Sequence, residues 1–480
     1  MVHVPFTGGH PGCRTLAVVG GGPAGLTAAL LLARAGHAVH LFERSGQLGG
    51  LWASRLDADG YFRGDNSCKV FQSAYRTTPA LFDLLGTTWQ QHFEKRHDLT
   101  TDWLRPFVSD SSLRDLLVLV SALIRARLGW GRAAQLSVEQ FLADEGVSEA
   151  CCAWLRATAL GGIAGTLRMT MWELAHRVGS NLGEILRGAQ GPLFWNAQPP
   201  NVAGGFLDSW RRALDALGVT VHLDAPVLRV DAAPAVVTDQ GTYRVEAVLL
   251  AVPPPALGGL LGASDDRVAE GFGRTRSELN RFLRVSRYEH VGISWFFDRM
   301  LPNDLPLGGH NVRRGWHPIL VQHGQYGPWL RPPARTVVVG SIAVDTTFQH
   351  HRLGTLPSAH TSEELARILW EDERLVDRSL PEPIDVEIMG ASNATQIVGE
   401  GPLPMRHHDA AIYLASNLHG RAPYFTASLE SAIQAGALAA AEVAPEVERL
   451  PMGGAVRLPW GLSPVSRRLE PCGAGASSRA

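Results

Sequence analysis

Residues 16–43 read LAVVGGGPAGLTAALLLARAGHAVHLFE, and this stretch decides the fold of the amino-terminal part of the chain. The apolar run at 16–19 predicts a strand, the glycines at 20–22 predict a tight turn, and residues 23–35 predict a helix. A second apolar run at 38–42 predicts another strand, which ends at an acid, Glu43. This order is typical of a βαβ dinucleotide-binding unit, whereas an ordinary βαβ unit is the alternative.

Each fingerprint glycine has a physical role in such a unit. Gly20 allows the turn, Gly22 has no Cβ and lets backbone approach a pyrophosphate, and Gly25 lets the helix pack close to the strand. The helix N-terminus offers free N–H groups and partial positive charge to an anion. Glu43 lies 18 residues after Gly25, where a carboxylate can accept from ribose hydroxyls and would repel a 2′-phosphate. We therefore expect an unphosphorylated adenosine ribose.

Composition limits the class of protein. The chain has 480 residues, 45% hydrophobic and 19% charged, with a net charge of −2, which predicts two or three domains and no nucleic-acid partner. Its five cysteines form no C-x-x-C pair and its start lacks a signal-peptide pattern, so we expect free thiols and a cytoplasmic location. No 18-residue apolar run predicts a membrane span. The apolar segment 116–124 predicts a buried helix, with membrane-surface contact as the alternative.

The rest of the chain predicts an α/β protein with an inserted α+β domain. A glycine-rich loop follows Glu43, and the pattern from 79 to about 187 is helical, with a capping box at Ser137 and Gln140. Residues 247–252 predict a buried strand, residues 411–416 another, and residues 426–443 an alanine-rich helix. We expect one dinucleotide domain from 12–75, 196–262 and 385–448, a substrate domain from 76–195 (helical part 79–190) and 263–384, and a mobile tail at 451–480.

Three separated pieces together resemble the flavin-containing amine oxidase superfamily, which includes amine oxidases, protoporphyrinogen oxidase and phytoene desaturases. They are the fingerprint running into Gly49-Gly50, the stretch from Gly205-Phe206 through AVLLAVPPPAL, and IYLASNLHGRAPYFTASLESAIQAGALAA near the end. The resemblance implies a Rossmann-type FAD-binding domain with non-covalent FAD. It also implies that the last helix directs its N-terminus at the flavin, where Thr426 can cap it.

The resemblance and the motifs together define a candidate site. The candidate cofactor-binding residues are Gly20, Gly22, Pro23, Ala24, Gly25, Glu43, Arg44, Gly49, Gly50, Leu51, Trp52, Asn66, Val227, Pro253, Asn417, Thr426, Ala427 and Ser428. The candidate catalytic residues are Lys69, Arg63, Tyr424, Phe425 and His419. Tyr424 and Phe425 are expected beside the flavin ring, Arg63 as a clamp for a substrate carboxylate, and His419 near flavin or substrate, with a solvent-facing histidine as the alternative. No metal site is expected.

The chain departs from the family pattern at three places. Asn417 stands where the family usually has an acid, and Leu51 and Trp52 stand where it usually has an arginine, so Arg44 is a candidate to supply the missing cation. Many amine oxidases carry a late lysine that helps O₂ react, and no lysine follows Lys95 here. Lys69 is the remaining candidate, and a surface lysine is the alternative.

These observations predict an FAD-dependent oxidoreductase that removes hydride from a small organic substrate in a biosynthetic pathway. Both amine or amino-acid oxidation and C–C desaturation fit, and the missing late lysine favours a dehydrogenase or desaturase. A flavin-dependent isomerase or mutase without net redox, and a non-catalytic protein that keeps the fold, stay open. So does a homodimer.

Overall fold

The structure is a computed structural model, which describes residues 12–67, 69–72, 75–95, 111–157, 166–176, 178, 194–197, 205–302, 315–394, 402–423 and 428–452. The expected tail beyond residue 452 and the four site candidates at 424–427 lie outside these residues. Among the described residues, no helix is both long and apolar enough to cross a bilayer.

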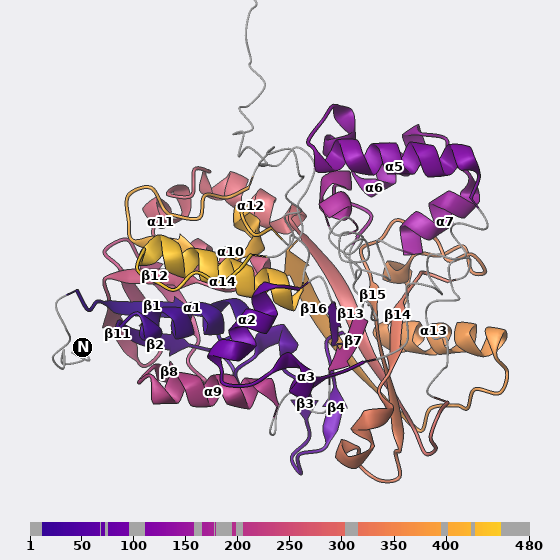
Figure 1. The fold of residues 1–480 in the computed structure, drawn as a ribbon, viewed down its shortest axis with the longest axis horizontal. Coiled ribbons are helices and arrows are strands. Elements are labelled where there is room, and N and C mark those ends of the chain that lie inside the picture. The colour runs from indigo at the N-terminus through magenta and orange to yellow at the C-terminus, as the bar shows by residue number, and fades with distance from the viewer. Residues whose placement is uncertain are drawn as a thin grey trace, which may run out of the picture.

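A parallel five-stranded sheet forms the first half of the molecule (Figure 1). Its order is β17-β12-β1-β2-β8, and every neighbouring pair runs parallel. The strands are β1 (Thr15–Val19), β2 (Ala38–Phe42), β8 (Thr220–His222), β12 (Ala247–Leu250) and β17 (Ile412–Leu414). The βαβ unit predicted from residues 16–43 is therefore present, with α1 (Pro23–Arg34) as its crossover. Strands from three distant parts of the chain meet in this one sheet.

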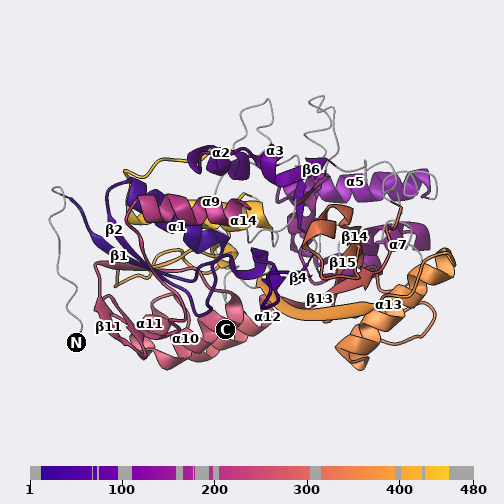
Figure 2. The same cartoon turned by 90° about the horizontal axis from the view of Figure 1, so that it is seen from below.

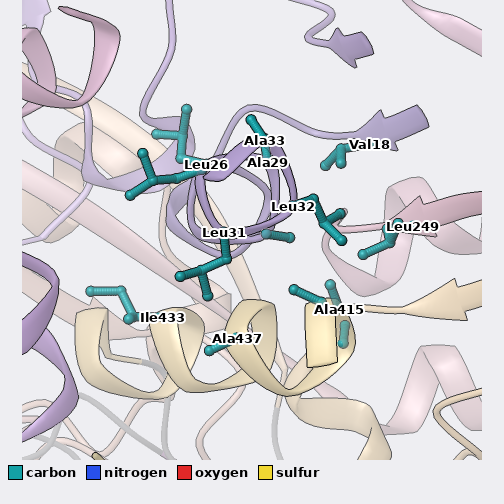
Figure 3. Close-up of a cluster of buried hydrophobic side chains, with 14 of the residues drawn as sticks. Val18, Leu26, Ala29, Leu31, Leu32, Ala33, Leu249, Ala415, Ile433 and Ala437 are labelled. Carbon is teal, nitrogen blue, oxygen red and sulfur yellow. The ribbon is translucent and has the colours of Figure 1, made fainter. Parts of the chain in front are cut away.

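Alternation along β1 sends its side chains to both faces, as expected for a doubly covered parallel sheet. Leu16 and Val18 join one core with α1, α9 (Phe206–Ala216) and α14 (Leu429–Val443), part of which Figure 3 shows. Ala17 and Val19 join another core on the opposite face. That second core contains α10 (Pro254–Ala263), α11 (Asp266–Glu270), α12 (Arg276–Val285) and the three-stranded sheet of β9 (Val227–Asp231), β10 (Ala235–Thr238) and β11 (Gly241–Arg244). Figure 2 shows the sheet between these two layers.

Gly436 lies where helices α1 and α14 pack against each other. A Cβ on Gly436 would lie 2.1 Å from the carbonyl oxygen of Ala24, in the first turn of α1. Only a residue without a side chain lets the two backbones approach this closely. Since Gly436 is seven residues after Leu429, the N-terminal half of α14 runs about 10 Å beyond this crossing.

The second half of the molecule is built on an antiparallel sheet of order β14-β15-β13-β16. Its strands are β13 (Arg287–Phe297), β14 (Ile319–Gln322), β15 (Thr336–Ala343) and β16 (Asp385–Ala394). Helix α13 (Ser362–Val376) covers one face, where Trp295 and Trp370 pack in one core. The hairpin of β3 (Arg55–Leu56) and β4 (Phe62–Gly64) brings Phe62 against Phe296 on the other face.

The remaining elements form a helical layer and a small sheet. The helices are α2 (Thr77–Leu84), α3 (Trp89–His92), α5 (Leu113–Arg127), α6 (Val138–Asp144) and α7 (Glu149–Ala157), and the sheet pairs β5 (Val70–Gln72) and β6 (Phe93–Lys95) with β7 (Phe194–Ala197). Short 3-10 turns are η1 (Gly50–Trp52), η2 (Arg132–Gln135), η5 (Gly324–Trp329), η6 (Pro357–Ala359) and η7 (Asn417–His419). The predicted capping box is present, with Ser137 accepting from Gln140 N.

The two large sheets divide the chain elsewhere than the expected boundaries at 262 and 385. Strand β16, which begins the segment expected in the dinucleotide domain, does not join the parallel sheet. It pairs with β13 of the antiparallel sheet along ten residues. Helices α11 and α12, expected in the substrate domain, bury Val268, Phe282 and Leu283 against the parallel sheet instead. Hydropathy along the chain shows that these segments are buried, but it does not show which sheet they face.

Candidate active site

The glycine turn after β1 is held by backbone contacts on both sides. Gly20 has φ +107°, donates its N–H to Phe42 O at 2.8 Å, and has no room for a side chain, because a Cβ would lie 2.5 Å from Ala251 O. A Cβ on Gly25 would lie 1.9 Å from Gly20 O. Both glycines are therefore required by the packing of the turn on α1 and β12.

A second glycine pair lies directly on the first. Gly49 N donates to Gly21 O at 2.8 Å, and Gly50, with φ +53°, would put a Cβ 3.0 Å from Gly22 Cα. Gly22 is the N-cap of α1 and has no side chain with which to cap the helix, and Pro23 follows at the first position. Gly22, Pro23 and Ala24 are half-buried, so the start of α1 stays accessible to an anion.

Glu43 lies at the carboxyl end of β2 and is buried. Its Oε2 accepts from Gly21 N at 2.8 Å, and its Oε1 accepts from Ser45 N at 3.0 Å and Ser45 Oγ at 2.8 Å. Three donors fill part of the roughly four acceptor positions of a carboxylate. The carbonyl of Glu43 accepts from Ala225 N, which brings Val227, at the start of β9, to the same edge. Arg44 is exposed beside them.

The carboxyl ends of four strands form one row at this edge of the sheet. Neighbouring strands are about 4.8 Å apart, so Asn417, after β17, and Glu43, after β2, are separated by three spacings of that size. Pro253, the N-cap of α10, follows β12 between them. Asn417 donates through Nδ2 to Ser431 Oγ at 2.9 Å, which ties the end of β17 to the first turn of α14.

The start of α14 differs from the prediction. The helix begins at Leu429, and its N-cap is Ser428, whose side chain accepts from Ser431 N in a capping box, so Thr426 does not cap it. The physical reason is that Ser428 keeps an extended backbone at φ −154°, so the helix begins only after it and its N-cap lies two residues later in the chain than expected. Tyr424, Phe425, Thr426 and Ala427 lie outside the described residues.

Lys69 is buried rather than at the surface. Its Nζ donates to Leu51 O at 2.7 Å, lies 3.7 Å from Asp65 Oδ1, and lies 5.2 Å from the centre of the Trp52 ring. Asp65 is fully buried and accepts from Ser54 Oγ at 2.7 Å. Burial raises the pKa of Asp65, and the nearby Lys69 ammonium opposes that rise. The surface alternative for Lys69 is therefore wrong.

The loop that carries Lys69 lies on the antiparallel sheet. A Cβ on Gly292 of β13 would lie 2.3 Å from Asn66 O, so the loop backbone rests directly on the strand. Next to it, burial lowers the pKa of His290 to about 4, although a hydrogen bond with the backbone of Asn66 opposes the shift. Lys69 thus joins the glycine loop of the first half of the molecule to the sheet of the second half.

Arg63 does not have the environment expected of a substrate clamp. Its Nη1 donates to Asp385 at 2.8 Å and its Nη2 to Glu387 at 2.6 Å, both on β16. The two carboxylates compensate the guanidinium charge and occupy its fork. Arg63 therefore links β4 to β16 through both of its terminal nitrogens, which are engaged by protein carboxylates.

His419 is buried at the end of η7, which excludes the solvent-facing alternative. Its Nδ1 accepts from Arg421 N at 3.0 Å, which leaves the proton of the neutral ring on Nε2. Burial lowers the pKa of His419 to about 3, so the ring is neutral at pH 7. Among the described residues, its Nε2 has no hydrogen-bond partner.

Sequence reasoning missed Glu430, a fully buried carboxylate in the first turn of α14. It accepts from the backbone N–H groups of Arg76, Thr77 and Thr78 at 2.8–3.0 Å, and also from Thr78 Oγ1 and Gln434 Nε2. It therefore caps α2 from a helix more than 350 residues away in the chain. The sequence signal that could have indicated Glu430 is an acid within an otherwise apolar, alanine-rich helix. Across the described residues, no group of three or more His, Cys, Asp or Glu could hold a metal ion.

Comparisons with known proteins agree with this geometry. The profile of the NAD(P)-binding Rossmann-like domain matches residues 18–88. A flavin-containing monooxygenase of Arabidopsis thaliana, FMO GS-OX-like 2, is 30% identical over 129 residues, which cover 24% of this chain and 28% of that protein. The sequence match thus spans little more than a quarter of the relative.

Solved structures extend the likeness over most of the chain. Cyclohexylamine oxidase from Brevibacterium oxydans superposes with a TM-score of 0.58 at 15% identity, covering 90% of this chain and 99% of its own. A double mutant of putrescine oxidase superposes with a TM-score of 0.58 at 14% identity, covering 90% of this chain and 98% of its own. An oxidoreductase from Methanosarcina mazei gives a TM-score of 0.59 at 14% identity over 88% of this chain and 98% of its own. The chain has the fold of these oxidases. The resemblance found in the sequence is confirmed at the level of this fold, in which three distant segments of the chain meet in one parallel sheet.

Proposed function

We propose that this protein is an FAD-dependent oxidoreductase that removes hydride from a small organic substrate. The observation that carries the proposal is the row of strand ends from Asn417 to Glu43, which adjoins the uncapped N-terminus of α1 and the first turn of α14. An adenine dinucleotide fits this edge, because the glycines at 22 and 50 keep it free of side chains and Glu43 supplies a carboxylate.

Each part of the cofactor has residues that would hold it. Glu43 would accept from a ribose hydroxyl at the acceptor position that Gly21 and Ser45 leave, and Val227 would border the adenosine. The start of α1, with Gly22, would hold the pyrophosphate. The helix dipole of α14, capped at Ser428, would stabilise negative charge on the ring system. The bound flavin would supply the two-electron acceptor.

The buried Lys69–Asp65 pair supports a catalytic role over a non-catalytic one. Burying an ammonium and a carboxylate is costly, and such pairs are common at functional sites. Lys69 donates to the carbonyl of Leu51, next to the glycine loop, and so helps to position that loop. We expect the substrate to be an amine, an amino acid or a compound that is desaturated. The cyclohexylamine and putrescine oxidases that share the fold make amines the first class to test.

The proposal is tested on the purified full-length protein. We expect a yellow protein whose released cofactor has the mass of FAD, and whose visible absorption is lost when an amine or a desaturation substrate is added without oxygen. Readmitting O₂ and measuring H₂O₂ separates an oxidase from a dehydrogenase. A colourless protein, or one that binds a nicotinamide dinucleotide instead, would refute the proposal.

A pair of glutamates gives a matched control. Glu43→Gln should weaken FAD binding by about ten- to a hundredfold, because it removes a charge-assisted hydrogen bond. Glu246 also accepts a backbone N–H of β1, from Thr15 at 2.7 Å, but at the opposite edge of the sheet. Glu246→Gln should leave FAD affinity unchanged. Equal effects of the two substitutions would argue against cofactor binding at the carboxyl edge.

A further inference from the structure

Helix α5 carries an apolar stripe on its outer face. Leu113, Leu117, Val120 and Ile124 are 73%, 63%, 51% and 53% exposed, and Trp130 just beyond the helix is 59% exposed. At 3.6 residues per turn, the four helical positions fall within about 60° of the circumference, so they form one continuous strip about 16 Å long. Figure 1 shows α5 at the outer edge of the helical layer, with α6 and α7 on its inner side.

The stripe belongs to a helix that is firmly mounted on the protein. The inner face buries Leu119, Ala122 and Ala126. At its start Ser112 and Asp115 form a capping box, and Asp115 Oδ1 also accepts from Ser148 N at 3.0 Å. The bare outer face is therefore presented by a rigid element and is not a consequence of a loosely attached helix.

The charged side chains that α5 itself exposes beside the stripe are basic. Between residues 112 and 132, all of which the structure describes, the only acid is Asp115, and its side chain is buried on the inner face. Arg114 and Arg125 are exposed along one flank of the stripe, and Arg132 follows Trp130. Arg132 is paired with Asp144 of α6 at 2.8 Å, so Arg114 and Arg125 carry most of the outward positive charge. The face is basic although the whole chain has a net charge of −2.

We propose that this face of α5 docks on the surface of an anionic lipid bilayer. Large apolar side chains along one strip, flanking arginines and a terminal tryptophan are the features with which a helix lies in the plane of a membrane interface. The arginines attract anionic headgroups. A second copy of this chain fits less well, because antiparallel pairing of two such stripes brings Arg114 of one copy beside Arg125 of the other. The proposal does not depend on the identity of the substrate.

The test is sedimentation of the full-length protein with vesicles. Vesicles of phosphatidylcholine with added phosphatidylglycerol should bind the protein, vesicles of phosphatidylcholine alone should bind it much less, and added salt should weaken the binding. The double substitution Leu117→Ser with Ile124→Ser should lower the partition coefficient at least about tenfold, because it removes the centre of the apolar strip. Arg125→Glu should lower it on anionic vesicles alone.

The matched control uses another exposed apolar pair. Leu375 and Val376, at the end of α13, are 52% and 47% exposed, and their replacement by serine should leave vesicle binding unchanged. Absence of binding to anionic vesicles would overturn the proposal. So would equal losses in the stripe and control variants, or light scattering that shows a dimer in the parent and a monomer in the stripe variant.

Discussion

Replacement of Glu430 tests whether α14 and α2 are joined as the structure indicates. Arg76, at the N-cap of α2, has no acceptor in its side chain, so the carboxylate of Glu430 serves the first N–H groups of that helix. In Glu430→Ala, the N–H groups of Arg76, Thr77 and Thr78 lose this acceptor in a buried place. At roughly 1–2 kcal/mol for each donor, the free energy of unfolding should fall by about 3–6 kcal/mol.

Glu430→Gln gives a graded intermediate. Its amide oxygen can still accept from Arg76 N and Thr77 N, and its NH₂ group can donate to Thr78 Oγ1. Only the N–H of Thr78 then loses its acceptor, so we expect a loss of about 1–3 kcal/mol. The expected order of stability is therefore parent, glutamine variant, alanine variant.

Two measurements follow this perturbation. Urea denaturation gives the change in midpoint, and hydrogen exchange of residues 75–84 gives local protection of α2, which should drop most in the alanine variant. Glu442→Ala is the control, because Glu442 lies on the same helix and pairs at the surface with Arg421; it should cost less than about 1 kcal/mol. Equal midpoints for the two alanine variants, with unchanged exchange in α2, would refute the reasoning.

Substitutions elsewhere in the site have equally specific outcomes. Gly50→Ala should lower the FAD content of the purified protein, because the added methyl group would press on Gly22. Gly354 has a similar positive φ, but a Cβ there would meet open space in the described structure, so Gly354→Ala should leave the FAD content unchanged. Lys69→Met should lower turnover by at least about tenfold and move the pH profile of kcat/KM upward, because the ammonium that lowers the pKa of the neighbouring carboxyl is gone. A turnover and profile like the parent's would exclude this role. His290 has a pKa of about 4 when folded and 6.5 ordinarily, so the unfolded chain takes up the proton first and stability falls as pH drops from 6.5 to about 4, by up to about 1.4 kcal/mol per pH unit. Urea midpoints across this range should slope less in His290→Asn.

The local elements could be predicted because their signals are local. The fingerprint from Gly20 to Glu43, the strand 247–250 and the capping box at Ser137 all follow from spacing and residue type over a few positions. The family resemblance added the expectation that the last helix reaches the same edge. The structure agrees, since Asn417 bonds to Ser431 in the first turn of α14.

The sequence by itself determined the βαβ unit, because glycine placement and hydrophobic alternation act between neighbours in the chain. Only the tertiary structure decided which distant groups meet. It buried Lys69 beside Asp65, engaged Arg63 with two carboxylates of β16, and aligned Glu430 with the start of α2. The reason is physical: a side chain's charge state and partners depend on what packs around it. For a lysine, an arginine or a glutamate, that neighbourhood comes from segments hundreds of residues away.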